Sequence, residues 1–168
     1  RLRPRKYSRS LPASVRTNLP GTSFKVRASF AIGACIVVGD TVLAVAGNRT
    51  RTENDPTAHA EMVALRAAAQ QAGNYRVSDA TVYSTIEPCV MCAGALIQAR
   101  VRRLVYGAHD ERAGAVESHF RVCDTDFLNH RIEVSAGVLE EECREIMQEF
   151  FRARRKEQMS EASSQRSE

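Results

Sequence analysis

The sequence of 168 residues has no apolar run approaching about 18 residues. This absence excludes a membrane-spanning helix and the hydrophobic segment of a secretory signal peptide. Cysteine is also scarce, because five residues are an odd number and too few for a disulfide scaffold. We therefore expect a cytoplasmic protein without membrane association, in which some of the thiols bind a metal ion.

Acidic residues are missing from the first 28 positions, which hold eight Lys or Arg. The rest of the chain has 16 basic and 20 acidic residues, a net charge of −4. The high isoelectric point therefore comes from residues 1–28 and is poor evidence that the folded body binds nucleic acid. With three prolines and no apolar period, this segment is expected to be a disordered basic tail. An organelle import signal is the alternative interpretation.

From residue 29 onward the pattern changes to that of one folded domain, which we place at 29–157, with a disordered Ser/Glu/Gln-rich tail at 158–168. Strands are predicted at 29–38, 40–47, 79–86, 101–107 and 130–137, and helices at 55–72, 88–100 and 138–157. Gly39-Asp40 is a hairpin signal, Asp55 is the predicted N-cap of the first helix, and Gly73 is its C-terminal stop. Strands that alternate with helices indicate a layered α/β fold.

Two short motifs carry the chemistry of the sequence. AHAEM places His59 and Glu61 two residues apart at one helix start, and PCVMC places Cys89 and Cys92 three apart at the next. Cysteines at i and i+3 share a helix face, and a helix N-terminus favours the thiolate form. Two thiolates and one imidazole are three ligands for tetrahedral Zn²⁺, with the fourth position left to water. Glu61 is then a carboxylate that can accept a proton from this water.

Each motif by itself has a simpler interpretation. A lone HxE is usually incidental, and a lone CxxC is commonly redox-active or half of a structural zinc site. A structural site would need a fourth protein ligand, and no second CxxC or HxxxH is present. The two motifs together, each opening a helix after a strand, therefore favour a catalytic site with one Zn²⁺ per subunit.

The pattern H-x-E…P-C-x-x-C is the signature of zinc-dependent nucleobase deaminases. Beyond it, GNYRVSDATVYSTIEPCVMCAGALIQARVRRLVYGAHDERAGA, NHRIEV and FFRARR closely resemble tRNA-specific adenosine deaminases of the TadA type, from about residue 29 to 157. The resemblance implies a cytidine-deaminase-like fold, with three α/β/α layers around a central five-stranded mixed sheet, and a homodimer. The implied reaction is hydrolytic deamination of adenosine to inosine at the wobble position of a tRNA anticodon stem-loop, with Glu61 as the catalytic proton shuttle.

The resemblance also implies substrate contacts outside the two motifs. Asn48 matches a family residue that lies against the target base, and Asp110 matches one that contacts the nucleotide sugar. Phe150, Phe151 and Arg154 fall in the stretch that resembles the tRNA-contacting end. The alternatives are a turn residue for Asn48, a loop cap for Asp110, core packing for the two Phe side chains and a solvated helix end for Arg154.

One departure from the family lies at the amino terminus, where the amphipathic helix that precedes the first strand is not recognisable. Ser29 and Ala31 stand where the family has an acidic residue and a proline. Cys123 has no role that the resemblance explains. We also expect a local basic surface built from Arg102, Arg103, Arg152, Arg154 and Arg155.

Two other functions compete with the tRNA deaminase. A free-base or nucleoside deaminase, acting on guanine or cytosine, shares the zinc ligands but has no need of the basic FFRARR stretch. A non-catalytic zinc-containing RNA-binding subunit is expected to have lost the glutamate, and Glu61 is present. The sequence therefore favours the tRNA adenosine deaminase.

Overall fold

The computed structural model describes residues 31–165 of the chain. Its elements are β1 (Gly33–Val38), β2 (Thr41–Gly47), α1 (Ala60–Ala72), β3 (Ala80–Ile86), α2 (Val90–Gln98), β4 (Arg103–Ala108), the short 3₁₀ helix η1 (Val122–Asp124), β5 (Glu133–Ser135) and α3 (Glu140–Gln165). The strands form one sheet in the order β2-β1-β3-β4-β5. β1 runs antiparallel to β2 and β3, whereas β3, β4 and β5 run parallel, so the predicted five-stranded mixed sheet is confirmed. The expected tail at 1–28 and the start of the predicted first strand lie outside the described residues.

β1 and β2 form the predicted hairpin. The chain reverses at Gly39, whose φ of 56° lies in the left-handed region that favours glycine. Gly33 at the start of β1 pairs with Gly47 at the end of β2, and Ala34 pairs with Ser84 near the end of β3. The ends of β2 and β3 therefore lie at the same edge of the sheet.

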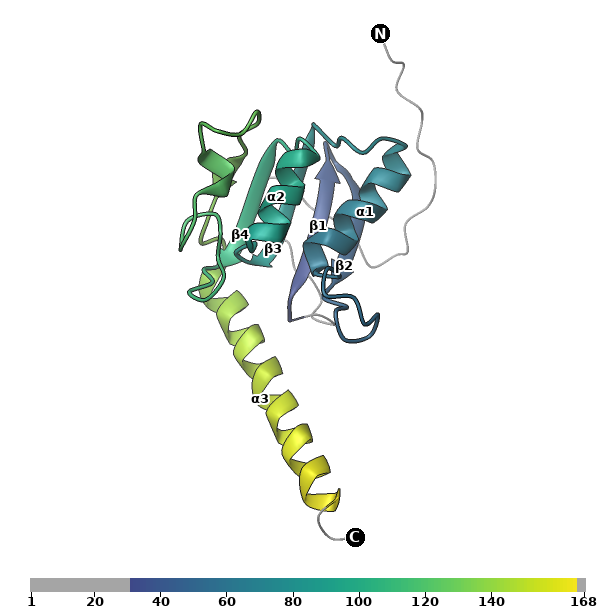
Figure 1. Ribbon diagram of the computed structural model, residues 1–168, viewed down its shortest axis with the longest axis vertical. Coiled ribbons are helices and arrows are strands. Elements are labelled where there is room, and N and C mark those ends of the chain that lie inside the picture. The colour runs from purple at the N-terminus through teal and green to yellow at the C-terminus, as the bar shows by residue number, and fades with distance from the viewer. Residues whose placement is uncertain (1–30, 166–168) are drawn as a thin grey trace.

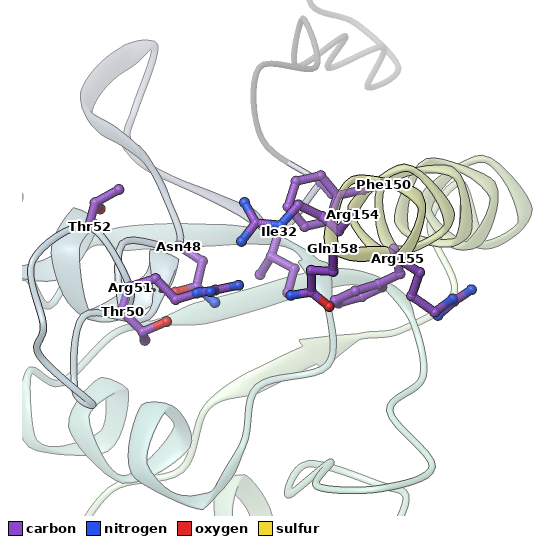
Figure 2. A pocket seen from close by; sticks show the side chains of 11 residues that line it. Ile32, Asn48, Thr50, Arg51, Thr52, Phe150, Arg154, Arg155 and Gln158 are labelled. Carbon is purple, nitrogen blue, oxygen red and sulfur yellow. Dashed lines mark hydrogen bonds between the residues drawn. The ribbon is translucent and has the colours of Figure 1, made fainter. Parts of the chain in front are cut away.

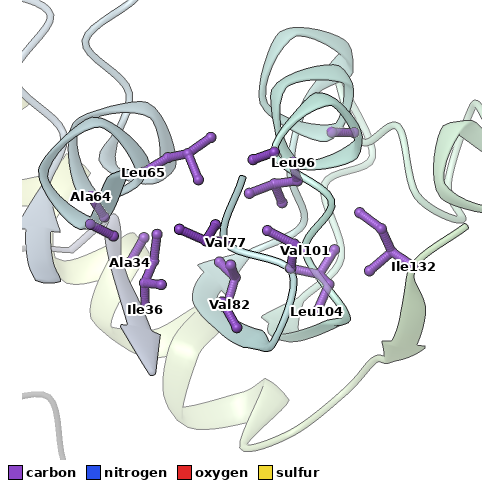
Figure 3. Close-up of a cluster of buried hydrophobic side chains, with 14 of the residues drawn as sticks. Ala34, Ile36, Ala64, Leu65, Val77, Val82, Leu96, Val101, Leu104 and Ile132 are labelled. Carbon is purple, nitrogen blue, oxygen red and sulfur yellow. The ribbon is translucent and has the colours of Figure 1, made fainter. Parts of the chain in front are cut away.

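Helices α1 and α2 cover one face of the sheet (Figure 1). Alternate strand residues point into this layer, and Ile36, Val82 and Leu104 have 0% exposed surface. They belong to the same buried cluster as Ala64 of α1 and Leu96 of α2 (Figure 3). Burying an aliphatic side chain of this size contributes about 1.5–3 kcal/mol, so this layer supplies much of the driving force for folding. Cys123, which had no assigned role, is a buried member of the same cluster.

Helix α3 begins on the opposite face of the sheet. Gly107 of β4 points away from the α1–α2 layer, and its α-carbon lies close to the Cys143 side chain of α3. The Val138 amide donates a 3.1 Å hydrogen bond to the Tyr106 carbonyl, which holds the start of the helix at β4. α3 then runs beyond the edge of the sheet (Figure 1). Its first turns supply the described part of the third layer.

The predicted N-cap of the first helix is wrong. α1 begins at Ala60 with His59 as its N-cap, in extended conformation. The Asp55 carboxylate instead accepts hydrogen bonds from the Thr57 amide and hydroxyl, both 2.7 Å long. Such a local Asx turn competes with the helix for backbone groups, so the helix starts later. The predicted end of the helix at Gly73 is confirmed. This residue has φ 63°, and its amide donates hydrogen bonds to the carbonyl groups of Ala69 and Gln70 in the last turn.

The end of α3 differs from the sequence prediction as well. The helix continues to Gln165, so the part of the expected 158–168 tail that the structure describes is helical rather than disordered. Residues 158–165 contain Gln, Met, Glu and Ala and have no proline or glycine to stop the helix. No helix in the range 31–165 is both long enough and apolar enough to cross a bilayer.

The close contact at Gly107 predicts that a side chain there is not tolerated. A Cβ at this position would lie 2.8 Å from both the Cys143 Cβ and the Thr85 carbonyl oxygen. We expect Gly107→Ala to lower the free energy of unfolding by about 1–3 kcal/mol, measured by urea denaturation. Gly94→Ala is the matched control, because its Cβ meets nothing within 4 Å. Because Gly94 lies within helix α2, Gly94→Ala should raise the free energy of unfolding by up to about 1 kcal/mol. Equal stability of Gly107→Ala and the unmodified protein would contradict the assigned contact.

Candidate metal centre and active site

The site lies where the starts of α1 and α2 meet at one edge of the sheet. His59 is the N-cap of α1 and Cys89 is the N-cap of α2, and both residues have extended backbone. β2 leads into the first helix and β3 into the second, and both strands end at this edge. Ligands of open α/β sheets bind in the same place, outside the carboxyl ends of the strands.

The donor atoms of His59, Cys89 and Cys92 form a compact cluster. His59 Nδ1 lies 3.6 Å from the Sγ atoms of both Cys89 and Cys92. The three donor atoms all lie within 4.8 Å of one another. With Zn–N near 2.05 Å and Zn–S near 2.3 Å, tetrahedral coordination places a nitrogen and a sulfur ligand about 3.6 Å apart. The three predicted ligands therefore fit a bound metal ion of this kind.

The electrostatics of the two cysteines also suit a cation. Hydrogen bonding from Cys92 lowers the pKa of Cys89 to about 5, with further support from the nearby His59 ring and the Met91 amide. The same bond, together with burial, raises the pKa of Cys92. The pair thus already holds one thiolate at neutral pH, and a cation is needed to stabilise a second.

The Glu61 carboxylate lies beside the cluster. Its side chain is only 3% exposed, and Oε2 lies 3.6 Å from Cys92 Sγ. Oε1 accepts a 2.9 Å hydrogen bond from the Ser84 hydroxyl of β3. Burial raises the pKa of Glu61, partly offset by a backbone hydrogen bond and by Ser84. A carboxyl group in this environment can take up a proton and release it again.

Ser84 was missed in the sequence, although a signal for it is present. It shares the inward face of β3 with Val82, where an apolar residue is the rule, and it is 7% exposed. A polar residue at an inward strand position therefore pointed to a partner inside the fold.

Asn48 borders a groove between the turn after β2 and helix α3. The groove has a volume of about 470 Å³, and Figure 2 shows Asn48 and Arg51 on one side and Phe150 and Arg154 on the other. Phe150 and Phe151 are 42% and 45% exposed, so these rings are not core residues. The Arg154 guanidinium lies 5.9 Å from the centre of the Phe150 ring. The groove thus offers aromatic and cationic groups together.

Part of the predicted basic surface is wrong. Arg154 and Arg155 line the groove together with Arg51, which was not anticipated. Arg102 and Arg103 lie at the start of β4, the opposite edge of the sheet, because the strand runs parallel to β3. Residues at the start of a strand cannot be assigned to an edge of the sheet until the direction of that strand is known.

Asp110 follows β4 and lies in a separate loop. Its carboxylate accepts hydrogen bonds from the amides of Arg112 (2.9 Å) and Ala113 (3.2 Å), which is the loop-cap arrangement. Its own amide donates a 3.1 Å bond to the buried carboxylate of Glu87, another residue missed in the sequence. The structure therefore gathers His59, Glu61 and the cysteines at one point and leaves Asp110 on a neighbouring loop.

The sheet, the three-donor cluster and the adjacent buried carboxylate together define a deaminase site. Consistent with this, a family model described as MafB19-like deaminase matches residues 15–155. Similarity to a solved structure from a study of A-to-I editing by tRNA:A34 deaminases has a TM-score of 0.66 at 47% identity, and covers 68% of this chain and 83% of that one. A guanine deaminase from Nitrosomonas europaea is more distant, with a TM-score of 0.57 at 25% identity over 71% of each chain.

Curated relatives narrow the assignment. A tRNA-specific adenosine deaminase of Agrobacterium fabrum is 47% identical over 124 residues, which cover 74% of this chain and 82% of the relative. The corresponding protein of Haemophilus influenzae is 48% identical over 110 residues, and the match spans 66% of this chain and 64% of the relative. The chain therefore belongs to the tRNA-specific adenosine deaminases within the MafB19-like deaminase family.

The donor cluster predicts stoichiometric metal binding. We expect about one zinc ion per chain by elemental analysis, falling below a tenth in Cys89→Ala and Cys92→Ala, because two ligands do not retain the ion. Cys143→Ala is the matched control, since this half-buried thiol lies outside the cluster, and it should keep full zinc content. Equal zinc loss in all three variants would show that the metal is not held at this cluster.

Proposed function

We propose that the chain catalyses hydrolytic deamination of adenosine to inosine at the wobble position of a tRNA anticodon, with one Zn²⁺ held by His59, Cys89 and Cys92. The observation that carries this proposal is the buried Glu61 carboxylate next to the three-donor cluster, at the sheet edge where the groove opens. The relatives named tRNA-specific adenosine deaminases support the choice of substrate.

The metal ion would supply one part of the chemistry, which is the activation of a water molecule as the nucleophile. The chain's own residues handle the protons. Glu61 accepts a proton as oxygen adds to C6 of the adenine and delivers it to the ring nitrogen N1. It then takes the remaining proton from the C6 hydroxyl group and transfers it to the departing amino group, so that the C–N bond breaks, ammonia leaves and a C6 carbonyl remains. Ser84 orients the carboxylate through its bond to Oε1, which leaves Oε2 facing the cluster.

The groove suits an RNA loop rather than a free base. Unpaired bases can be splayed out and stacked on aromatic rings, while guanidinium groups neutralise phosphates. Phe150 and Phe151 offer exposed rings, and Arg51, Arg154 and Arg155 surround them. Asn48 follows the end of β2 and lines the groove, and its Oδ1 accepts a 3.1 Å hydrogen bond from the Thr50 amide. Its contact with the target base stays a prediction from the resemblance. A guanine or cytosine deaminase acting on free bases would have no use for this surface.

The remaining assignments follow from the resemblance. A homodimer, a cytoplasmic location, the sugar contact at Asp110 and the domain limits 29 and 157 stay predictions. Size-exclusion chromatography with light scattering tests the dimer, and a mass of one chain at micromolar concentration would contradict it.

Loss of the Glu61 carboxylate should abolish catalysis and spare the metal. On a synthetic anticodon stem-loop with adenosine at the wobble position, we expect Glu61→Gln to reduce inosine formation by more than about 10³-fold, because general acid–base transfer through this group is lost. Zinc content should be unchanged. Glu53→Gln is the matched control at an exposed position and should retain activity. Inosine formed by Glu61→Gln at the normal rate would contradict the assigned role.

Charge reversal at the groove should weaken RNA binding. We expect Arg154→Glu with Arg155→Glu to raise the Kd for the stem-loop at least tenfold and to flatten its salt dependence, because each lost phosphate contact reduces counterion release. Arg102→Glu with Arg103→Glu is the matched control at the opposite edge of the sheet. Unchanged affinity of the first pair, or equal loss in both, would rule out the groove as the RNA site.

A further inference from the structure

Glu87 is a buried charge whose partners nearly all come from one loop. Its side chain has 0% exposure and stands at the end of β3, two positions before Cys89. Among the described residues no Lys or Arg pairs with it, and the basic group within 4 Å is His109, whose Nδ1 lies 3.6 Å from Oε2. An ionised carboxylate in the interior is costly unless hydrogen bonds replace its hydration.

The loop 109–118 supplies the hydrogen-bond donors that take the place of water around the Glu87 carboxylate. Oε1 of Glu87 accepts hydrogen bonds from three successive amides, those of Val116 (3.0 Å), Glu117 (2.8 Å) and Ser118 (2.9 Å). Oε2 accepts the Asp110 amide at 3.1 Å and the hydroxyl of Ser118. Successive amides that converge in this way form an anion-binding nest. The buried carboxylate is thus satisfied by hydrogen bonds from this loop.

The loop 109–118 also bonds to the backbone of the segment that contains the predicted metal ligand Cys89. The Ala115 amide donates to the Pro88 carbonyl at 2.9 Å, and Cys89 forms an isolated antiparallel bridge with Gly114. At Gly114 there is no room for a side chain, because a Cβ would meet the Glu87 carboxylate carbon at 2.5 Å and the Asp110 carbonyl oxygen at 2.6 Å. The loop and the strand end are therefore packed as one unit around the carboxylate.

We propose that Glu87 is a positioning residue that locks the loop 109–118, and with it Asp110, against the strand end that presents Cys89. The inference rests on the proposed function, because that function is what makes Asp110 a substrate contact. Glu87 does not touch substrate in this scheme. It acts through the Asp110 amide, so that the carboxylate of Asp110 stands at a fixed place when the nucleotide binds. A role limited to general stability is the competing explanation.

Hydrogen exchange tests the lock without any substrate. In the zinc-loaded protein, we expect Glu87→Gln to accelerate exchange of the amides in the loop 109–118 at least tenfold, first of all that of Asp110, because an amide nitrogen in place of Oε2 opposes the Asp110 amide and the Ser118 hydroxyl. Exchange in the α1–α2 core should not change. Ser118→Ala, which removes one donor to the same oxygen and keeps the charge, is the milder variant and should accelerate the same amides. Unchanged exchange in both variants, or uniform acceleration throughout the protein, would overturn the proposal.

A kinetic double-mutant cycle separates positioning from stability. On the stem-loop substrate, Glu87→Gln should lower kcat/KM at least tenfold in the unmodified background, and less than threefold in an Asp110→Ala background. Zinc content should stay the same in every variant. Val77→Ala is the matched control, a core truncation that precedes the start of β3, whereas Glu87 follows its end. Its effect should be equal in both backgrounds.

The two experiments distinguish the failure of this proposal from that of the proposed function. A tenfold loss from Glu87→Gln in both backgrounds would mean that the residue acts on stability or on another group, which overturns the positioning role. Absence of any deamination by the unmodified, zinc-loaded protein would overturn the proposed function. In that event the exchange experiment still decides whether Glu87 locks the loop.

Discussion

The meeting of two helix N-termini at one sheet edge is the constraint on which the rest of the site depends. β2 and β3 both end at this edge because β1 lies between them and runs antiparallel to each. The residues that follow these strands, His59 and Cys89, therefore face each other as N-caps. Unpaired amides at both helix starts favour negative charge, which suits thiolates and a nearby carboxylate. A different strand order would leave the same residues far apart.

Two buried glutamates at this edge show how the surroundings decide what a carboxylate does. Glu61 accepts side-chain hydrogen bonds from Ser84 and, at 3.6 Å, from Cys92, and its burial raises the pKa, so it can carry a proton. Glu87 receives four amide bonds and a hydroxyl bond, and its pKa falls to about 2, so it stays ionised. The first arrangement suits proton transfer and the second suits a fixed anchor. The same residue type thus serves chemistry in one place and architecture in the other.

Helix α3 lies partly beyond the edge of the sheet and lines one side of the groove, so it extends the candidate site away from the sheet. Its start is held at β4 by the close approach of Gly107 and Cys143, and its later turns face the loop after β2. Exposed aromatic rings on a surface helix are costly in water and are typical of interaction sites. The groove that Arg154 and Arg155 of α3 line together with Asn48 and Arg51 is therefore a candidate interaction surface outside the three-donor cluster.

The sequence by itself determined the chemistry of the centre, because His59, Glu61, Cys89 and Cys92 are recognisable from short spacings that local geometry imposes. It also determined the hairpin at Gly39 and the stop at Gly73, which depend on local backbone conformation. The start of α1 also depends on local backbone conformation, because the Asx turn at Asp55 competes with the helix for backbone groups, but the pattern predicted the helix too early. Only the tertiary structure decided which distant side chains meet. It also separated Arg102 and Arg103 from the groove, brought in Arg51, and gave Ser84 and Glu87 their partners. These contacts join residues that are far apart in the chain. The periodicity of a segment carries no information about the order of the strands, or about which loop donates hydrogen bonds to a buried group.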